Sequence, residues 1–201
     1  MLIGDGIGAT VISGSQSFKA GYKTFYTATF AVDAVGFIAY NISFENTAGP
    51  KKDMVVALRS DSDLSIFYQF DFIFGDSTVV FQKCHILVRQ GKPEQNMNTI
   101  TAQSRKYMNE STGFSFQFCN ISADIGLKPT TQTYLGRPWD AYSRTIFMQS
   151  YMSAKLGSRV KWPGYHVLVE SEARKFTVAE LIEGDLWLPA SDVTYTGGLS
   201  V

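Results

Sequence analysis

Four short segments of similar sequence recur along the chain, and they constrain its fold more than any other feature. Each segment places a Phe or Met beside a polar or small residue, and turn-rich sequence separates one segment from the next. Their starts lie about 30 to 40 residues apart, a spacing typical of stacked coils that cannot bury an apolar face alone. We therefore predict an all-β fold, a right-handed parallel β-helix, with a β-sandwich as the alternative. The four segments are Ile42–Asn46, Val80–Cys84, Ser115–Cys119 and Ile146–Ser150.

The sequence after residue 36 alternates between apolar and polar residues, which is the period of a β-strand. We predict one continuous strand here, whose apolar face runs from Ile38 to Phe44. Aromatic residues make up 14 % of the chain, and they pack well on pleated sheets, so the composition agrees with a β-rich fold. Further strands are expected at Val79–Leu87, Phe114–Ile121 and Thr145–Met152.

One helix is predicted near the C-terminus, at Phe176–Leu181. Thr177 is the expected N-cap, and Glu180 three residues later completes a capping box. Phe176 and Leu181 are placed to form a hydrophobic staple, and Gly184 to end the helix. We expect this short helix to pack on the body of the protein as a lid.

The composition excludes several functional classes. Lys and Arg number 18 and Asp and Glu also number 18, so no bulk charge is available to hold nucleic acid or an anionic membrane. His85 and His166 are isolated, the two cysteines form no CxxC motif, and no GxSxG motif is present. We therefore expect no metal, no cofactor, no nucleic-acid partner and no membrane span, and we expect a monomer.

Two segments carry distinctive chemistry. Phe70–Gly75 places Asp71 in an apolar and aromatic strand, where desolvation must raise its pKa or a cation must keep it ionised. Tyr134–Trp139 offers that cation as Arg137, in a rigid turn beside Trp139. We predict an ion pair between Asp71 and Arg137 in an outer groove flanked by Trp139 and Phe74. The alternative is a buried structural ion pair with a core tryptophan.

With these residues the chain resembles the plant-type pectin methylesterases. The resemblance covers most of the chain, and its most specific part is Asp71–Gly75 followed by Tyr134–Trp139. It implies a right-handed parallel β-helix that hydrolyses methyl esters of galacturonan in the cell wall, with Asp71 as nucleophile. Arg137 would orient Asp71 and keep it ionised, and Trp139 would contact the sugar. Other matching motifs are Gly4–Gly6, Gly36–Ala39, Phe44–Pro50, Val56–Arg59, Thr101–Gln103, Tyr142–Thr145 and Trp162–Tyr165.

The chain also departs from the family pattern. After Arg59 the family continues through a coil with the motif GYQDTLY, which holds its general acid and an oxyanion glutamine. Here the sequence runs almost at once into Asp71, and Met54 stands where the family has a second oxyanion glutamine. We interpret residues 1–201 as one domain without its N-terminal coils and without at least one internal coil. Impaired hydrolysis is therefore expected, and the alternatives are a non-catalytic pectin-binding module, a degenerate pseudoenzyme, or a fragment that does not fold stably.

The resemblance also bears on processing. It implies a disulfide between Cys84 and Cys119 and an extracellular, cell-wall location, although no signal peptide is visible at the start of this chain. Pectin, as methylated homogalacturonan, is the expected partner. Three N-x-Ser sequons are present, at Asn41, Asn109 and Asn120. Asn41 and Asn120 fall in predicted strands, so we expect a glycan at Asn109 alone.

Overall fold

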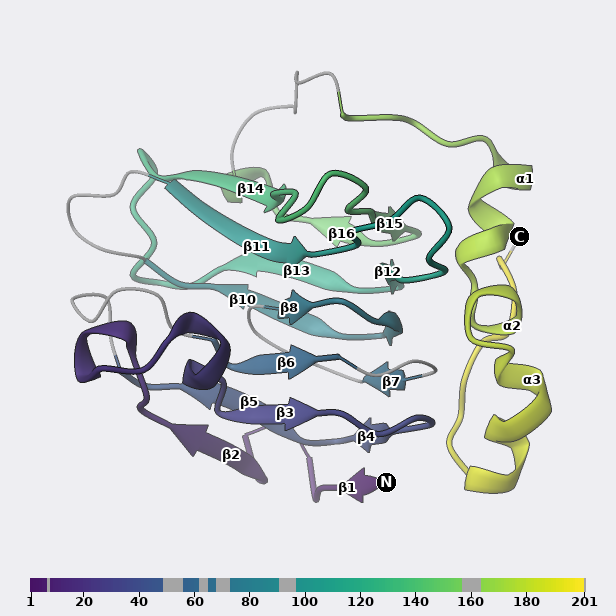
Figure 1. Cartoon of the computed structure of the whole chain (residues 1–201), viewed down its shortest axis with the longest axis horizontal. Helices are drawn as coiled ribbons and strands as arrows, with labels where there is room; N and C mark the ends of the chain where they lie inside the picture. Colours follow the sequence, from purple (N-terminus) through teal and green to yellow (C-terminus); the bar gives the residue numbers. More distant parts are fainter. Residues whose placement is uncertain are drawn as a thin grey trace.

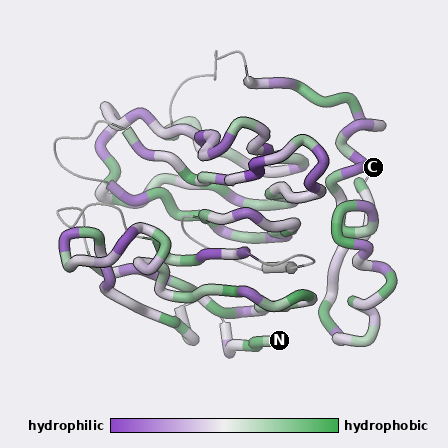
Figure 2. The backbone as a smooth tube through the Cα atoms, in the orientation of Figure 1, coloured by the Kyte–Doolittle hydropathy of each residue, from purple (hydrophilic) through white to green (hydrophobic). Residues whose placement is uncertain are grey.

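The chain is a parallel β-solenoid with short helices at its C-terminal end, as the computed structural model shows (Figure 1). The predicted parallel β-helix is confirmed. The structure describes residues 1–6, 8–48, 56–61, 65–67, 73–90, 97–156 and 164–200. Every strand pair among the described residues is parallel, and buried apolar residues of successive coils form one core cluster. Hydrophobic and hydrophilic residues alternate along the coils (Figure 2).

The strands form three sides of the solenoid. One side is a six-stranded sheet of β1 (Leu2–Ile3), β4 (Ile38–Tyr40), β7 (Ser65–Phe67), β9 (Thr78–Gln82), β12 (Gly113–Gln117) and β15 (Thr145–Met148). The second is a five-stranded sheet of β3 (Phe30–Val32), β6 (Leu58–Ser60), β8 (Ile73–Gly75), β11 (Met97–Gln103) and β14 (Gln132–Gly136). The third side carries two small sheets, β2 (Val11–Gly14) with β5 (Ser43–Asn46), and β10 (His85–Val88) with β13 (Asn120–Ala123) and β16 (Tyr151–Met152). Short 3-10 turns are η1 (Phe18–Ala20), η2 (Thr24–Thr27) and η3 (Ala154–Leu156).

Three of the four similar segments stack in register in the six-stranded sheet. Phe81 pairs with Phe116, and Phe116 pairs with Phe147, on successive coils. Their rings stack with centroids 4.6 Å apart in both pairs. The sequence repeat therefore reflects a column of side chains through the core. The segment Ile42–Asn46 does not belong to this column, because its strand β5 lies on the third side of the solenoid.

The predicted continuous strands are wrong in one respect, since each is two strands joined at a corner. At each corner one residue adopts a left-handed backbone with φ between 50° and 56°, which turns the chain from the six-stranded sheet to the third side. The turn also interrupts the alternation, so that Ile38 faces outward while Ile42 and Phe44 enter the core. The corner residues are Asn41, Lys83, Phe118 and Gln149.

One coil is much shorter than the others. In the five-stranded sheet Phe30 pairs with Leu58 and Ile73 with Thr101, each 28 residues apart, whereas Leu58 pairs with Ile73 only 15 residues later. The coils on either side nevertheless stay in register, because β6 pairs with β8 and β7 with β9. On the third side, β5 and β10 fall in separate sheets.

The C-terminal helices cover the outer face of the six-stranded sheet. They comprise α1 (Glu170–Ala173), η4 (Arg174–Phe176), α2 (Val178–Leu181), α3 (Gly184–Trp187) and η5 (Leu188–Ser191). Val178, Ile182 and Leu188 form an apolar cluster with Ile38 and Val80 of the sheet, so the predicted packing of a helix on the body is confirmed.

The predicted N-cap of that helix is confirmed, the predicted capping box and the predicted end at Gly184 are wrong, and the staple of Phe176 with Leu181 stays a prediction. Thr177 is the N-cap of α2, but the Thr177 hydroxyl donates back to the Arg174 carbonyl at 2.8 Å, so no capping box forms. Gly184 does not end α2 and instead begins α3. A Cβ at Gly184 would lie 2.4 Å from Val178, so this glycine lets α3 pack closely against α2.

The chain beyond the helices runs along the stack and is held by glutamines (Figure 1). Gln82, Gln117 and Gln149, on three successive coils, donate to the carbonyls of Thr196, Gly198 and Ser200, each at 2.8 Å. The glutamines also bond to one another, from Gln82 to Gln117 at 3.0 Å and from Gln117 to Gln149 at 2.9 Å. We call this set the glutamine ladder.

Candidate functional site

The outer face of the five-stranded sheet carries a row of aligned side chains. Arg59 of β6, Phe74 of β8 and Ala102 of β11 are direct neighbours in the register. The residues one position earlier in β6 and β8, Leu58 and Ile73, point into the core. Because successive side chains of a strand alternate between faces, the row belongs to the outside of the solenoid.

An aromatic pair stands on this row. The rings of Phe74 and Trp139 meet edge to face with centroids 4.9 Å apart. Phe74 is 9 % exposed and Trp139 is 44 % exposed, so Trp139 presents the accessible ring. The backbone N–H of Trp139 donates to the carbonyl of Gln103 at 3.1 Å, which fixes this turn to the end of β11. The two residues predicted to flank a groove are thus in contact, and their role toward a sugar stays a prediction.

Arg137 lies in the same turn and is exposed. Its backbone N–H donates to the Thr101 carbonyl at 3.0 Å, and its guanidinium carbon lies 5.3 Å from the centre of the Trp139 ring. Among the residues that the structure describes, no carboxylate forms an ion pair with it. Asp71 lies outside the described residues, so the pairing of Asp71 with Arg137 stays a prediction. The exposure of Arg137 means that such a pair would be hydrated on one side.

Gln103 joins the two loops beside the aromatic pair. Its side chain is buried, and its Oε1 accepts from the backbone N–H groups of Arg105 at 3.1 Å and Arg144 at 2.9 Å. These contacts tie the loop 104–112 to the turn 137–144. In the sequence Gln103 stands out only as part of a matching motif, which gives no sign of this positioning role.

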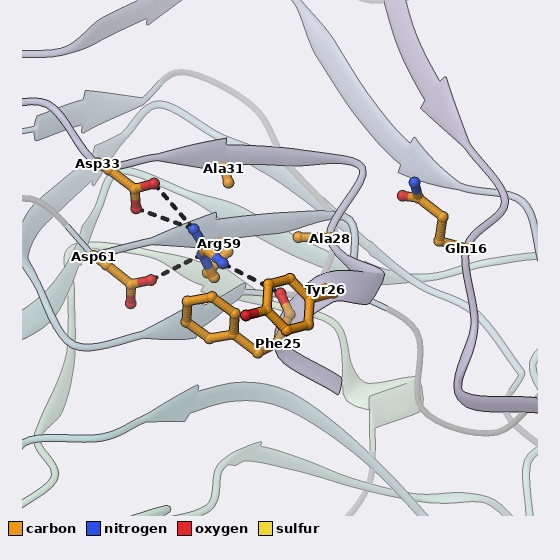
Figure 3. Close-up of a pocket in the computed structure, with 8 residues that line it drawn as sticks. All are labelled: Gln16, Phe25, Tyr26, Ala28, Ala31, Asp33, Arg59 and Asp61. Atoms are coloured by element: carbon orange, nitrogen blue, oxygen red, sulfur yellow. Dashed lines mark hydrogen bonds and ion pairs between the residues drawn. The ribbon is translucent and has the colours of Figure 1, made fainter. Parts of the chain in front are cut away.

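A hollow of about 640 Å³ lies on the same face (Figure 3). Arg59 in its lining is the register neighbour of Phe74. At its centre the Arg59 guanidinium donates to both carboxylate oxygens of Asp33, at 3.0 and 3.1 Å, and stacks 3.7 Å from the Phe25 ring centre. Arg59 Nε also lies 2.8 Å from Asp61 Oδ2, without the alignment of a hydrogen bond. The hollow is lined by Gln16, Phe25, Tyr26, Ala28, Ala31, Asp33, Arg59 and Asp61.

Asp61 has a raised pKa in this cluster. Burial raises the pKa of Asp61, and this effect outweighs the opposing influence of the Asp76 backbone N–H and of Arg59. Gly75 permits the arrangement, because a Cβ there would lie 2.1 Å from the Ser60 carbonyl oxygen and its φ of 136° is unfavourable for other residues. No motif in the sequence predicts this cluster.

The raised pKa of Asp61 predicts a pH effect on stability. The folded chain binds the proton of the Asp61 carboxyl group more tightly than the unfolded chain does, because the aspartates of an unfolded chain have a pKa of about 3.9. The stabilising contribution of Asp61 to the free energy of unfolding is therefore complete below about pH 3.9, and it is lost as the pH rises through the higher pKa of the folded chain. Asp61→Asn has no carboxyl group at this position and so does not lose this stabilisation. As the pH rises above about 4, the free energy of unfolding of Asp61→Asn should rise more, or fall less, than that of the unsubstituted chain. Urea denaturation between about pH 4 and 7 measures the slope.

Asp5→Asn is the matched control, because it neutralises an exposed aspartate in the first coil, outside the cluster around Arg59. If the two substitutions change the slope equally, the assignment to burial of Asp61 is wrong.

The two cysteines lie on adjacent coils as buried free thiols, which differs from the expected disulfide. The Cys119 thiol donates to the Phe81 carbonyl at 3.3 Å, and a hydrogen bond with Cys84 lowers the pKa of Cys119. The backbone N–H of Asn120 donates to the Cys84 carbonyl at 2.7 Å, so Cys84 and Cys119 occupy equivalent positions on adjacent coils. Neighbouring strands lie about 4.8 Å apart, which is within the span of a disulfide, so the bridge stays a prediction for oxidised protein.

The described residues contain no cluster of three or more His, Cys, Asp or Glu side chains placed to hold a metal ion. Within the same part of the chain, no helix has the length and apolarity needed to cross a membrane.

The outer-face row, the aromatic pair and the parallel solenoid together define the class of protein. The family model described as "Pectinesterase" matches residues 1–71 and 69–158, and the chain belongs to the pectinesterase family. It is 49 % identical over 264 aligned residues to the pectinesterase/pectinesterase inhibitor PPE8B of Prunus persica, covering 100 % of this chain and 50 % of that protein. It is 48 % identical to the probable pectinesterase/pectinesterase inhibitor 32 of Arabidopsis thaliana, covering 99 % and 49 %. The chain thus spans about half the length of these curated relatives.

Solved structures agree with this assignment. The pectin methylesterase from carrot is 32 % identical, with a TM-score of 0.80, over 97 % of this chain and 80 % of that one. The pectin methylesterase from Aspergillus niger is 29 % identical, with a TM-score of 0.57, over 71 % of this chain and 54 % of that one. A pectin methylesterase in complex with a hexasaccharide is 18 % identical, with a TM-score of 0.64 over 99 % of this chain and 84 % of that one, and shares the fold.

Proposed function

We propose that this chain binds methyl-esterified galacturonan on the outer face of its five-stranded sheet and hydrolyses the methyl ester slowly. The observation that supports this most is the contact between Phe74 and Trp139. Phe74 stands three residues after Asp71, and Trp139 stands two residues after Arg137. A sugar ring would stack on the accessible face of Trp139. The Asp71 carboxylate would attack the ester carbonyl, the bond from the carbonyl carbon to the methoxy oxygen would break, and that oxygen would take a proton from solvent water and leave as methanol. Water would then hydrolyse the acyl intermediate, return protons to the solvent and restore the carboxylate. By the same family relationship, we propose that the protein is extracellular and acts in the cell wall.

We further propose that a missing internal coil impairs this activity. The two matches to the family model meet at residues 69–71, and the alignment to the peach relative spans 264 residues although this chain has 201. The spacing of 15 residues between Leu58 and Ile73 supports an excision at the same place. The lost coil would have supplied the general acid and one oxyanion donor. Met54, at the position of the other donor, lies outside the described residues.

Methanol release from highly methylated pectin tests this proposal. Loss of general-acid catalysis typically costs about 10²–10⁴ in rate, and loss of one oxyanion donor about 10²–10³. We therefore expect release at least about 10²-fold slower than from an intact relative under the same conditions. Asp71→Asn should abolish the residual release. Release at the rate of the intact relative would contradict the impairment, and residual release unchanged by Asp71→Asn would contradict Asp71 as nucleophile.

The second candidate function is a non-catalytic pectin-binding module. The exposed Trp139 ring, with Arg137 beside it, favours this function because neither residue depends on the lost coil. Binding to pectin without methanol release would support it. Trp139→Ala should then weaken binding, while Tyr151→Ala, which removes an exposed aromatic residue on the third side of the solenoid, should not.

A further inference from the structure

The loop 104–112 presents the sequon Asn109–Ser111 at the tip of a turn beside the candidate site. We propose that Asn109 is an N-glycosylation site, and this proposal depends on the extracellular location proposed above. The ligand class is an N-acetylglucosamine-based oligosaccharide, transferred from a lipid diphosphate donor. In that step the Asn109 Nδ2 bonds to the anomeric carbon of the first sugar, the bond from that carbon to the phosphate oxygen breaks, the lipid diphosphate leaves, and one amide proton is released.

The hydrogen bonds that close the loop do not use the Asn109 side chain. The Glu110 carboxylate accepts from the backbone N–H groups of Lys106 and Tyr107, both at 2.9 Å, and so closes the turn. The Arg105 Nε donates to the Glu110 carbonyl at 2.9 Å and holds the base of the turn. Asn109 and Ser111 are both exposed. Within the described part of the chain, the Asn109 side chain makes no hydrogen bond that a glycan would have to replace.

The other two sequons are held by hydrogen bonds to neighbouring coils, although the Asn120 side chain is exposed. Asn41 is a left-handed corner residue whose carbonyl accepts from Gly6 at 3.1 Å. Asn120 begins β13, where its N–H bonds to the Cys84 carbonyl and the Ser122 hydroxyl of its sequon lies 2.7 Å from the His85 ring. An acceptor asparagine and its hydroxyl residue must both be free to enter the transferase. Asn109 is the sequon that meets this condition among the three.

Tyr107 gives the first sugar a surface to rest on. It precedes Asn109 by two residues within the same turn and is 56 % exposed. The Lys106 ammonium lies 5.7 Å from the centre of its ring, which leaves ring surface for the apolar face of a sugar. Met108, which stands between Tyr107 and Asn109 in the sequence, is also exposed, so the glycan would cover an apolar surface that otherwise faces water.

The glycan would stand at the rim of the candidate site. The Tyr142 N–H donates to the Arg105 carbonyl at 3.2 Å, which joins the loop carrying Asn109 to the turn carrying Arg137 and Trp139. Asn109 stands in a different loop from Phe74 and Trp139, so its glycosylation leaves the aromatic pair unmodified.

Expression of the full chain behind a secretion leader in a eukaryotic host tests the proposal. Both the secreted and the retained fractions are treated with peptide N-glycosidase in water labelled with heavy oxygen, and peptides are examined by mass spectrometry. We expect the label on residue 109 and on no other sequon. Asn109→Gln and Ser111→Ala should each abolish the mobility shift, and Asn120→Gln is the matched control that should retain it.

Unmodified Asn109 in both fractions would overturn the proposal, as would a shift that disappears only with Asn120→Gln. The result is independent of catalysis, because a glycosylated chain that releases no methanol would contradict the proposed hydrolysis alone.

Discussion

Replacing Phe116 with alanine is expected to lower the free energy of unfolding by about 3–5 kcal/mol. Phe116 is fully buried and its ring stacks between those of Phe81 and Phe147, so the substitution leaves a cavity that joins three coils. In a solenoid each coil is stabilised by its neighbours, and a defect in a middle coil weakens both of its interfaces. The expected fall in the melting temperature is roughly 6–20 °C, measured by thermal unfolding followed by circular dichroism.

Phe147→Ala is the control for this prediction. Phe147 is at the end of the ring column and is only partly buried, so the same truncation should cost less. If both variants lose equal stability, the column does not couple the coils. Cooperative unfolding of the unsubstituted chain in the same experiment would also argue against a fragment that does not fold stably.

Gln117→Leu is the second change expected to have a large effect. Gln117 is fully buried in the middle of the glutamine ladder, where its Nε2 donates to Gln149 and to the Gly198 carbonyl, and its Oε1 accepts from Gln82. Leucine has a similar size but no polar atoms, so these partners lose their bonds. Each buried group left unpaired costs about 1–3 kcal/mol. We expect both a lower melting temperature and faster proteolysis of the chain after residue 193.

Gln149→Leu provides the comparison, because Gln149 is at the exposed end of the ladder and water can replace its bond to Ser200, while the buried Gln117 loses one partner and keeps the Gly198 carbonyl. It should free the last residues near Ser200 and lower the melting temperature less than Gln117→Leu does. If Gln117→Leu leaves the C-terminal residues as protected as before, the ladder does not hold them.

The coil repeat and the corners of the solenoid were predictable to different degrees. The recurrence of Phe81, Phe116 and Phe147 with the same neighbours was visible in the sequence, because stacked coils put equivalent residues in equivalent environments. The corners were not visible. Lys83 and Phe118 are unremarkable in sequence, and only the closure of each coil forces them into a left-handed backbone. This is why one continuous strand was predicted after residue 36, and why Ile42–Asn46 was aligned with the wrong side.

The candidate site divides in the same way. Local motifs indicated the family and pointed to Phe74, Arg137 and Trp139 as candidate site residues. These residues stand in short segments whose chemistry can be recognised from the local sequence alone. The cluster of Asp33, Arg59 and Asp61 is different, because Arg59 and Asp33 are 26 residues apart and neither segment is unusual by itself. The coil repeat and the family could thus be predicted from the order of residues alone. Which charges meet, and which glutamines hold the C-terminal residues, became visible only in the folded chain, because those contacts join coils that are far apart in sequence.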